Sequence, residues 1–243
     1  MKNNPSDLSE AVLREALRDK HWSIRLEAVN HADITQPEVL AAVVEMAKNE
    51  PEPSVRAVAI SLLGQTEDIQ YTPIFTQAIQ PDQAYSVLGA ALEALSKTEQ
   101  AAALAAAKEL EGDDNDGMVL AIAELYATQP SADNLSWFVQ RAEKIDNMGA
   151  FRFYDLYTQF LTGMGNTAVL EQSVERFKAV SFDTKASLWR RFSNTKAIAD
   201  LRTFYAGSAN AAKVQELTAL LAEIKEKETN ETLKLYYGMF DQP

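Results

Sequence analysis

Residues 23–29 read SIRLEAV, and residues 54–60 repeat this pattern as SVRAVAI, 31 positions later. Residues 86–92 (SVLGAAL) and 118–123 (MVLAIA) continue it at intervals of 32 positions. Self-similarity with a period of about 20 to 50 residues is typical of folds built from stacked helical hairpins. A small residue keeps its place in every copy: Ala28, Ala59, Ala91 and Ala123. We therefore predict four helical hairpins whose second helices pack closely at these alanines.

An acidic residue precedes the second helix of each hairpin, six positions before the Arg or Leu of the motif. These acids are Asp19, Glu50, Asp82 and Asp114. An acid in the turn that enters a helix can accept hydrogen bonds from free backbone N–H groups and complement the positive helix N-terminus. We expect Arg25 and Arg56 to reach back to their own acid or across to the acid of the next repeat. Leu88 and Leu120 replace arginine in the later copies, so we expect no continuous ladder there.

Apolar residues at three- and four-residue spacing predict helices along the whole chain, and no strand-like alternation occurs. The first helices of the hairpins are expected at 8–19, 38–48, 71–79 and 98–110, with prolines marking starts and stops. Isoleucine or valine at 24, 55, 87 and 119 is expected in the core between repeats. Later helices are expected at 134–145, 149–164, 168–180, 183–192, 196–205, 209–227 and 231–240. The prediction is an all-α superhelix, a HEAT-like solenoid of antiparallel hairpins.

The chain divides by charge and composition near residue 130. Its 243 residues carry a net charge of -12, and residues 1–130 hold 9 basic and 21 acidic side chains, whereas residues 131–243 hold 14 of each. Large aromatic residues concentrate in the second part. We predict four regular, acidic hairpins in 1–130 and a less regular, aromatic-rich continuation in 131–243. An acidic surface disfavours nucleic acid and anionic lipid as partners and leaves a basic partner open.

Several classes of protein are excluded by composition. The sequence has no cysteine, no apolar run of about 18 residues and no apolar stretch near Met1 that reads as a secretory signal. We therefore expect a soluble chain of undetermined compartment. The absence of cysteine excludes disulfides, thiolate zinc sites and cysteine nucleophiles.

No catalytic or metal site is predicted in this chain. The histidines, His21 and His31, stand ten positions apart, which does not suit a shared metal ligand set on one helix. The acidic run 109–116 before Gly117 lacks carboxylates at the first and twelfth positions of a calcium loop. There is also no Gly-x-Ser-x-Gly elbow and no glycine-rich phosphate loop. Catalytic residues, metal ligands and cofactors are accordingly expected to be none.

One local cluster combines cations with large aromatic side chains: Trp189-Arg190-Arg191-Phe192. Such a cluster on a helix of an acidic protein can grip a carboxylate or a peptide terminus, which makes Trp189, Arg190 and Arg191 candidates for partner contact. The alternative is that Trp189 and Phe192 face the core while the arginines pair with neighbouring acids.

The repeated motif resembles the second-helix signature of HEAT repeats, in which an acid is followed by Val/Ile-Arg and then Ala. Asp19 with Arg25 and Ala28, and Glu50 with Arg56 and Ala59, carry this resemblance. Regular hairpins followed by an aromatic-rich helical segment look like the C-terminal helical domain of bacterial zinc aminopeptidases of the aminopeptidase N family. That resemblance implies a non-catalytic domain that closes over a catalytic module of the same polypeptide and restricts substrate access. Zinc is then expected only in that module.

Two functions follow as hypotheses. In the first, the chain is this non-catalytic domain of a larger metallopeptidase, an interpretation that fits its abrupt start and end. In the second, it is a free-standing HEAT-like scaffold whose groove binds another protein. Both predict a protein or peptide partner, with no nucleic acid and no membrane.

Overall fold

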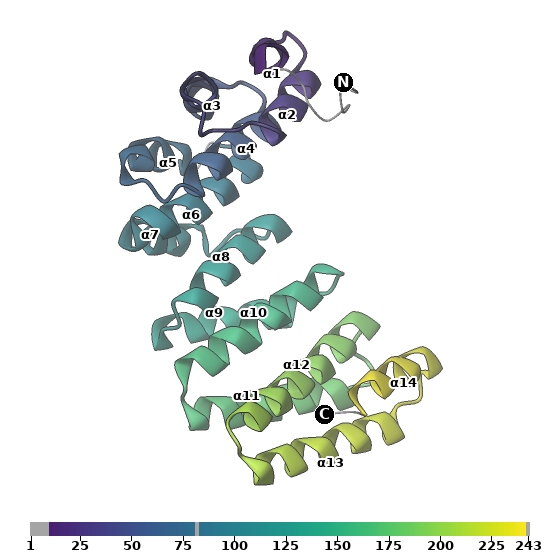
Figure 1. Cartoon of the computed structure of the whole chain (residues 1–243). Helices are drawn as coiled ribbons and strands as arrows, with labels where there is room; N and C mark the ends of the chain where they lie inside the picture. The colour runs from purple at the N-terminus through teal and green to yellow at the C-terminus, as the bar shows by residue number, and fades with distance from the viewer. Residues whose placement is uncertain (1–9, 81–82, 242–243) are drawn as a thin grey trace. The chain divides into compact units, whose positions relative to one another are not determined.

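The computed structural model describes residues 10–80 and 83–241, and this part of the chain contains helices and connecting turns but no strand (Figure 1). The prediction of an all-α fold of helical hairpins is confirmed. The chain forms two compact units, Met1–Leu125 (unit 1) and Tyr126–Pro243 (unit 2). Charge and repeat spacing suggested a division after residue 130, whereas these units divide within one helix, α8.

Unit 1 consists of helical hairpins, as the repeat predicts. Its helices are α1 (Glu10–Ala16), α2 (Trp22–Asn30), α3 (Pro37–Asn49), α4 (Pro53–Gly64), η1 (Ile69–Tyr71), α5 (Thr72–Ala78), α6 (Tyr85–Thr98), α7 (Gln100–Leu110) and α8 (Asp116–Thr128). In Figure 1, α3, α5 and α7 form one row and α2, α4 and α6 form a second row beside it. The hairpins α3–α4 and α5–α6 therefore each contribute one helix to each row.

The helices of unit 1 start where local chemistry favours a start. Pro37 and Pro53 are the first residues of α3 and α4, and Pro73 is in the first turn of α5. Proline suits this place because its fixed φ matches the helix and its missing N–H would have had no partner there. The first helix ends earlier than expected, since α1 stops at Ala16 rather than Asp19.

Small residues form the contact between successive second helices. The four alanines of the motif are all buried. At Gly64 of α4, an added Cβ would lie 2.7 Å from the Cβ of Ala94 in α6, so the two helices touch almost backbone to backbone. The motif's valines at 55, 87 and 119 are buried as predicted. The prediction is wrong for Ile24, which is exposed because α2 is the first helix of its row among the described residues.

Unit 2 is built from longer helices. They are α9 (Leu135–Lys144), preceded by η2 (Ala132–Asn134), α10 (Gly149–Met164), α11 (Thr167–Phe182), α12 (Leu188–Gly207), α13 (Ala211–Lys227), α14 (Glu231–Tyr237) and η3 (Gly238–Phe240). Side chains cap the starts of α11 to α14: Asn166, Ser187, Asn210 and Asn230 each accept a hydrogen bond from a backbone N–H of the first turn. Gly165 ends α10 with a φ of 60°, a left-handed conformation that glycine adopts without strain.

Aromatic side chains fill the core of unit 2. Phe138 of α9 stacks on Tyr157 of α10 with ring centroids 5.0 Å apart and lies 4.5 Å from Phe160. Phe177 of α11 meets Tyr157 edge-on at 5.5 Å. Such ring pairs add about 0.5 to 1.5 kcal/mol each beyond the area that they bury. The first helices of this unit are therefore held together by one continuous aromatic cluster.

Unit 2 has one long helix, α12, where two helices were expected. Separate helices were expected at 183–192 and 196–205, but the chain turns at 183–187 and then runs as the single helix α12. Ser193, Asn194 and Thr195, which favour turns in isolated sequence, are buried within this helix. The side chains of Asn194 and Thr195 bond back to the carbonyl oxygens of Arg190 and Arg191, 2.8 and 2.9 Å away, so they are satisfied without breaking the helix.

Candidate functional site

The acids of the first two repeats sit at helix entrances. An oxygen of Asp19 accepts a hydrogen bond from the backbone N–H of His21 at 2.8 Å, and Glu50 accepts one from Glu52 at 3.0 Å. Both acids therefore hold the turn that precedes a second helix. Asp82 lies outside the described residues. In the fourth repeat, Oδ1 of Asn115 accepts a hydrogen bond from the backbone N–H of Met118, and Asp113 accepts one from the N–H of Asn115.

Arg25 joins the first repeat to the second. One guanidinium nitrogen donates to the carbonyl oxygen of Asp19 at 2.8 Å, so the side chain reaches back to its own turn. Nε and the other nitrogen donate to the two carboxylate oxygens of Glu50 at 2.9 and 2.5 Å. Burial alone would raise the pKa of Glu50, but the hydrogen bonds from Arg25 and from the N–H of Glu52 outweigh it and lower that pKa.

Arg56 makes a related link with a different acceptor. Its Nε donates to the carbonyl oxygen of Ala47 at 3.1 Å, and a terminal nitrogen donates to Oε1 of Gln83 at 2.7 Å. Leu88 occupies the arginine position of the third repeat and is buried. The signature residues of the repeat therefore build the scaffold, and we assign them no contact with a ligand.

A groove lies on the second-helix face of unit 1. Its lining comes from α2, α4 and α6, with a volume of about 590 Å³. Small and polar residues line it: Asn30, Ala57, Val58, Ser61, Leu62, Gln65, Ser86, Ala90 and Glu93. Because equivalent positions of successive repeats line it, the groove is a direct product of the helix row.

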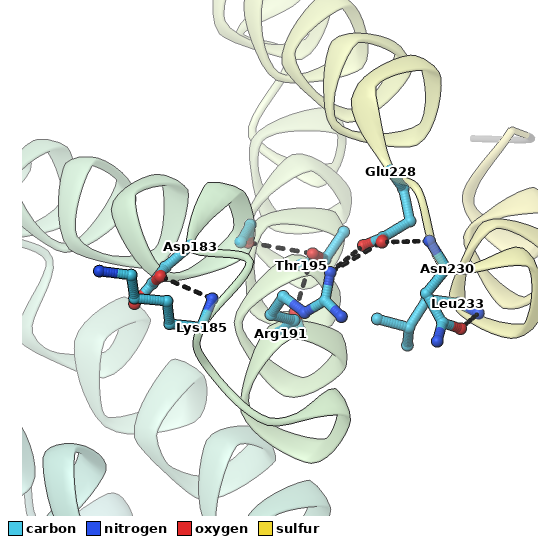
Figure 2. A network of polar contacts seen from close by, with 8 residues as sticks. Asp183, Lys185, Arg191, Thr195, Glu228, Asn230 and Leu233 are labelled. Carbon is cyan, nitrogen blue, oxygen red and sulfur yellow. Dashed lines mark hydrogen bonds and ion pairs between the residues drawn. The ribbon is translucent and has the colours of Figure 1, made fainter.

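The cluster Trp189, Arg190 and Arg191 is divided among three environments. Arg191 is buried and donates one nitrogen to both carboxylate oxygens of Glu228, at 2.7 and 2.8 Å (Figure 2). Trp189 is 41% exposed and packs edge-on against Phe151 with centroids 5.3 Å apart. Arg190 lines a small cavity between α9, α10, α11 and α12. Only Arg190 and Trp189 are accessible for contact with a partner.

Glu228 is the centre of a polar network that ties α12 to the turn between α13 and α14. One of its oxygens also accepts the backbone N–H of Asn230 at 2.8 Å, and Asn230 caps α14 through the N–H of Leu233 at 3.0 Å (Figure 2). Thr195 donates to the carbonyl oxygen of Arg191 or to Ser181, 3.0 Å away. The sequence did not single out Glu228, because its partner stands 37 positions away and no spacing connects the two.

Neither histidine lies in a ligand cluster. Among the residues that the structure describes, no group of three or more His, Cys, Asp or Glu side chains is placed to hold a metal ion. The Nδ1 of His31 lies 2.9 Å from the carbonyl oxygen of Glu27 in its own helix. Within the same part of the chain, no helix is both long and apolar enough to cross a membrane.

Comparison with known proteins supports the repeat. None of the curated proteins compared with this sequence matches it. Residues 40–127 match the family model described as HEAT repeats. The matched segment begins in α3 and ends in α8, so it includes α4 to α7 and every groove residue except Asn30 of α2. Residues 40–127 therefore carry HEAT-like repeats, within a chain whose described part is built from helices.

Proposed function

We propose that the chain is a helical scaffold that binds a basic segment of another protein along the groove of unit 1. The observation that carries this proposal is the groove itself, formed by second helices of successive HEAT-like repeats. Repeat scaffolds present extended surfaces of this kind to protein partners. Groove residues with amide and hydroxyl groups, such as Asn30, Ser61, Gln65 and Ser86, can bond to the backbone of an extended peptide.

Charge supports a basic partner. Residues 1–125 hold 21 acidic and 9 basic side chains, so the whole net charge of -12 belongs to unit 1. Glu93 brings one carboxylate into the groove, where it pairs with the exposed Lys97 at 2.8 Å. A surface of this sign accelerates association with a cationic segment and repels phosphate backbones.

Site-specific photo-crosslinking tests the location. A photoreactive residue placed at Ser86, which is exposed in the groove, should capture a partner in cells. The same residue at Ala41, exposed on α3 outside the groove, should not. Mass spectrometry of the adduct should map to a lysine- or arginine-rich segment. Equal capture from both positions would contradict a groove site.

Charge reversal tests the chemistry. A lysine-rich probe peptide should bind the chain more weakly after Glu93→Lys than after Glu45→Lys, which makes the same charge change on the exposed face of α3. Fluorescence anisotropy at two salt concentrations measures both. If the two variants weaken binding equally, the attraction is a property of net charge and the groove is not the site.

A second candidate role is that of a non-catalytic C-terminal domain of a zinc aminopeptidase. The order of regular hairpins followed by an aromatic-rich helical unit supports it. In this role the partner is a catalytic module of the same polypeptide, and the zinc belongs to that module. The purified chain should then cleave no aminoacyl anilide, and joining it to its module should raise KM for long peptides more than for a dipeptide. Peptidase activity of the isolated chain would exclude this role.

A further inference from the structure

Unit 2 contains a small cavity that neither the repeat nor its groove explains. Its volume is about 230 Å³, and four consecutive helices, α9 to α12, line it. The walls are mainly aromatic and aliphatic, with Tyr154, Tyr157, Phe177, Val139 and Val180 among them. Sites for drug-sized ligands usually measure about 300 to 1,000 Å³. This cavity therefore suits a group about the size of one amino-acid residue.

Two arginines face this apolar cavity without a carboxylate partner. Arg176 of α11 and Arg190 of α12 both line it, and neither forms an ion pair within the described part of the chain. Nε of Arg190 is buried and has no hydrogen-bond partner there. A buried, unpaired guanidinium nitrogen is costly, so it marks a place where an anion would be stabilised.

The pKa values of two tyrosines in the cavity wall reflect the positive charges of Arg190 and Arg176. Burial raises the pKa of Tyr154 to about 12, although the hydrogen bond from Asn194 and the charge of Arg190 oppose the rise. Burial also raises the pKa of Tyr157, and the neighbouring Ser173 hydroxyl and the charge of Arg176 oppose the rise. Each arginine therefore lies close enough to a phenol of the cavity wall to influence it.

One carboxylate, Glu143 of α9, lines the same cavity and is exposed. It pairs with neither arginine in the described structure. A ligand that carries an N–H group beside its carboxylate can therefore meet charges of both signs. An acylated amino acid and the C-terminal residue of a peptide share this arrangement: a carboxylate, an amide N–H and one side chain.

We propose that this cavity binds the carboxylate end of a peptide-like ligand. The carboxylate accepts hydrogen bonds from Arg176 and Arg190, the amide N–H is directed to Glu143, and an apolar side chain packs against Tyr154 and Phe177. This site is independent of the groove in unit 1, because every residue that lines it belongs to unit 2.

Titration of the full chain with N-acetyl-leucine, followed by NMR chemical shifts, tests the proposal. Saturable shifts are expected, and N-acetyl-leucinamide should bind at least about tenfold more weakly because its neutral amide cannot replace the carboxylate. A tetrapeptide that ends in leucine distinguishes the source of the ligand. Tighter binding of the tetrapeptide indicates a protein terminus, whereas equal binding indicates a free acylated amino acid, and both agree with the proposal.

Charge-removing variants locate the site. Arg176→Gln and Arg190→Gln should each weaken binding of N-acetyl-leucine by about tenfold. Lys178→Gln makes the same charge change two positions along α11, outside the cavity lining, and should leave binding unchanged. If Arg190→Gln does not fold, Arg176→Gln decides alone, since Arg176 is exposed. The proposal would be overturned if N-acetyl-leucine and N-acetyl-leucinamide bound equally well, or if Lys178→Gln weakened binding as much as the arginine variants. Binding of inorganic phosphate but not of N-acetyl-leucine would also overturn it.

Discussion

The two units pack helices in opposite ways. In unit 1 the second helices approach closely because alanine and glycine face each other, as at Gly64 and Ala94. In unit 2 large rings separate the helices and fill the space between them, as Phe138, Tyr157 and Phe177 do. Small residues can recur at a fixed interval in the sequence because each contact between successive second helices has a similar geometry. A ring cluster needs a different shape at each position, so it leaves no period in the sequence.

The units also differ in their main ion pairs. In unit 1, Arg25 and Glu50 connect two repeats, with side chains 14% and 5% exposed. In unit 2, Arg191 and Glu228 are more deeply buried, with side chains 8% and 2% exposed. Removing one partner from a buried pair leaves an unpaired charge in a low-dielectric region. We therefore expect the loss of one partner to destabilise the chain more at the Arg191–Glu228 pair than at the Arg25–Glu50 pair.

The largest effect is expected for Arg191→Ala. It leaves Glu228 buried without its cation and should reduce the free energy of unfolding by about 3 to 5 kcal/mol. Urea denaturation followed by circular dichroism measures this loss. Glu223→Gln, which removes an exposed partner of Lys227, should leave stability almost unchanged. Replacing Arg191 and Glu228 together by methionine and leucine should recover most of the loss, and failure to recover it would show that the surrounding network matters more than the charge.

The next effect concerns pH and the aromatic core of unit 2. The pKa of Tyr154 is about 12 in the folded chain and about 10 in an unfolded one. The stabilisation is fully present below pH 10 and is lost as pH rises through 12, because the unfolded phenol gives up its proton first. Two pKa units correspond to about 2 to 3 kcal/mol. The stability of Tyr154→Phe should therefore fall less between pH 10 and 12, and equal slopes for both proteins would contradict the assignment.

A smaller effect is expected at the repeat junction of unit 1. Glu50→Gln removes the charge that Arg25 meets and should cost about 1 to 3 kcal/mol, whereas Glu52→Gln should be nearly silent. Because the folded pKa of Glu50 is lowered, its contribution is present above its unfolded pKa and is lost as pH falls through the folded value. Acid titration of stability should show this loss in the parent chain and not in Glu50→Gln.

The sequence predicts the fold of unit 1 better than that of its partner unit. The recurring alanines and prolines specify hairpins locally, so most helices and the all-α class follow from pattern alone. The single helix α12 does not follow from the pattern, because the side chains of Asn194 and Thr195 form hydrogen bonds to backbone carbonyl oxygens that only the folded helix places within reach.

The candidate sites follow from the sequence only in part. Trp189, Arg190 and Arg191 stand out as a cluster, but a linear pattern cannot show that Arg191 is paired with Glu228 while Arg190 lines a cavity. Arg176 carries no local signal at all. Its role depends on the packing of four helices, which brings it to the same cavity as Arg190.

The smallest expected effects concern the close contact between helices in unit 1, where two Gly→Ala variants should change stability in opposite directions. In Gly64→Ala the new methyl group would lie 2.7 Å from the Cβ and 3.0 Å from the Cα of Ala94, so α4 and α6 must separate. This strain, about 1 to 3 kcal/mol, exceeds the gain of at most about 1 kcal/mol from better helix propensity, and stability should fall.

Gly89→Ala is the matched control, because its methyl group would lie 4.0 Å from the Cβ of Ala121, an ordinary contact. Only the gain in helix propensity applies there, so stability should rise by up to about 1 kcal/mol. Thermal denaturation of the two variants gives both signs in one experiment. If both variants are stabilised, a methyl group fits between α4 and α6 without strain. The distinction between small-residue packing in unit 1 and ring packing in unit 2 would then fail.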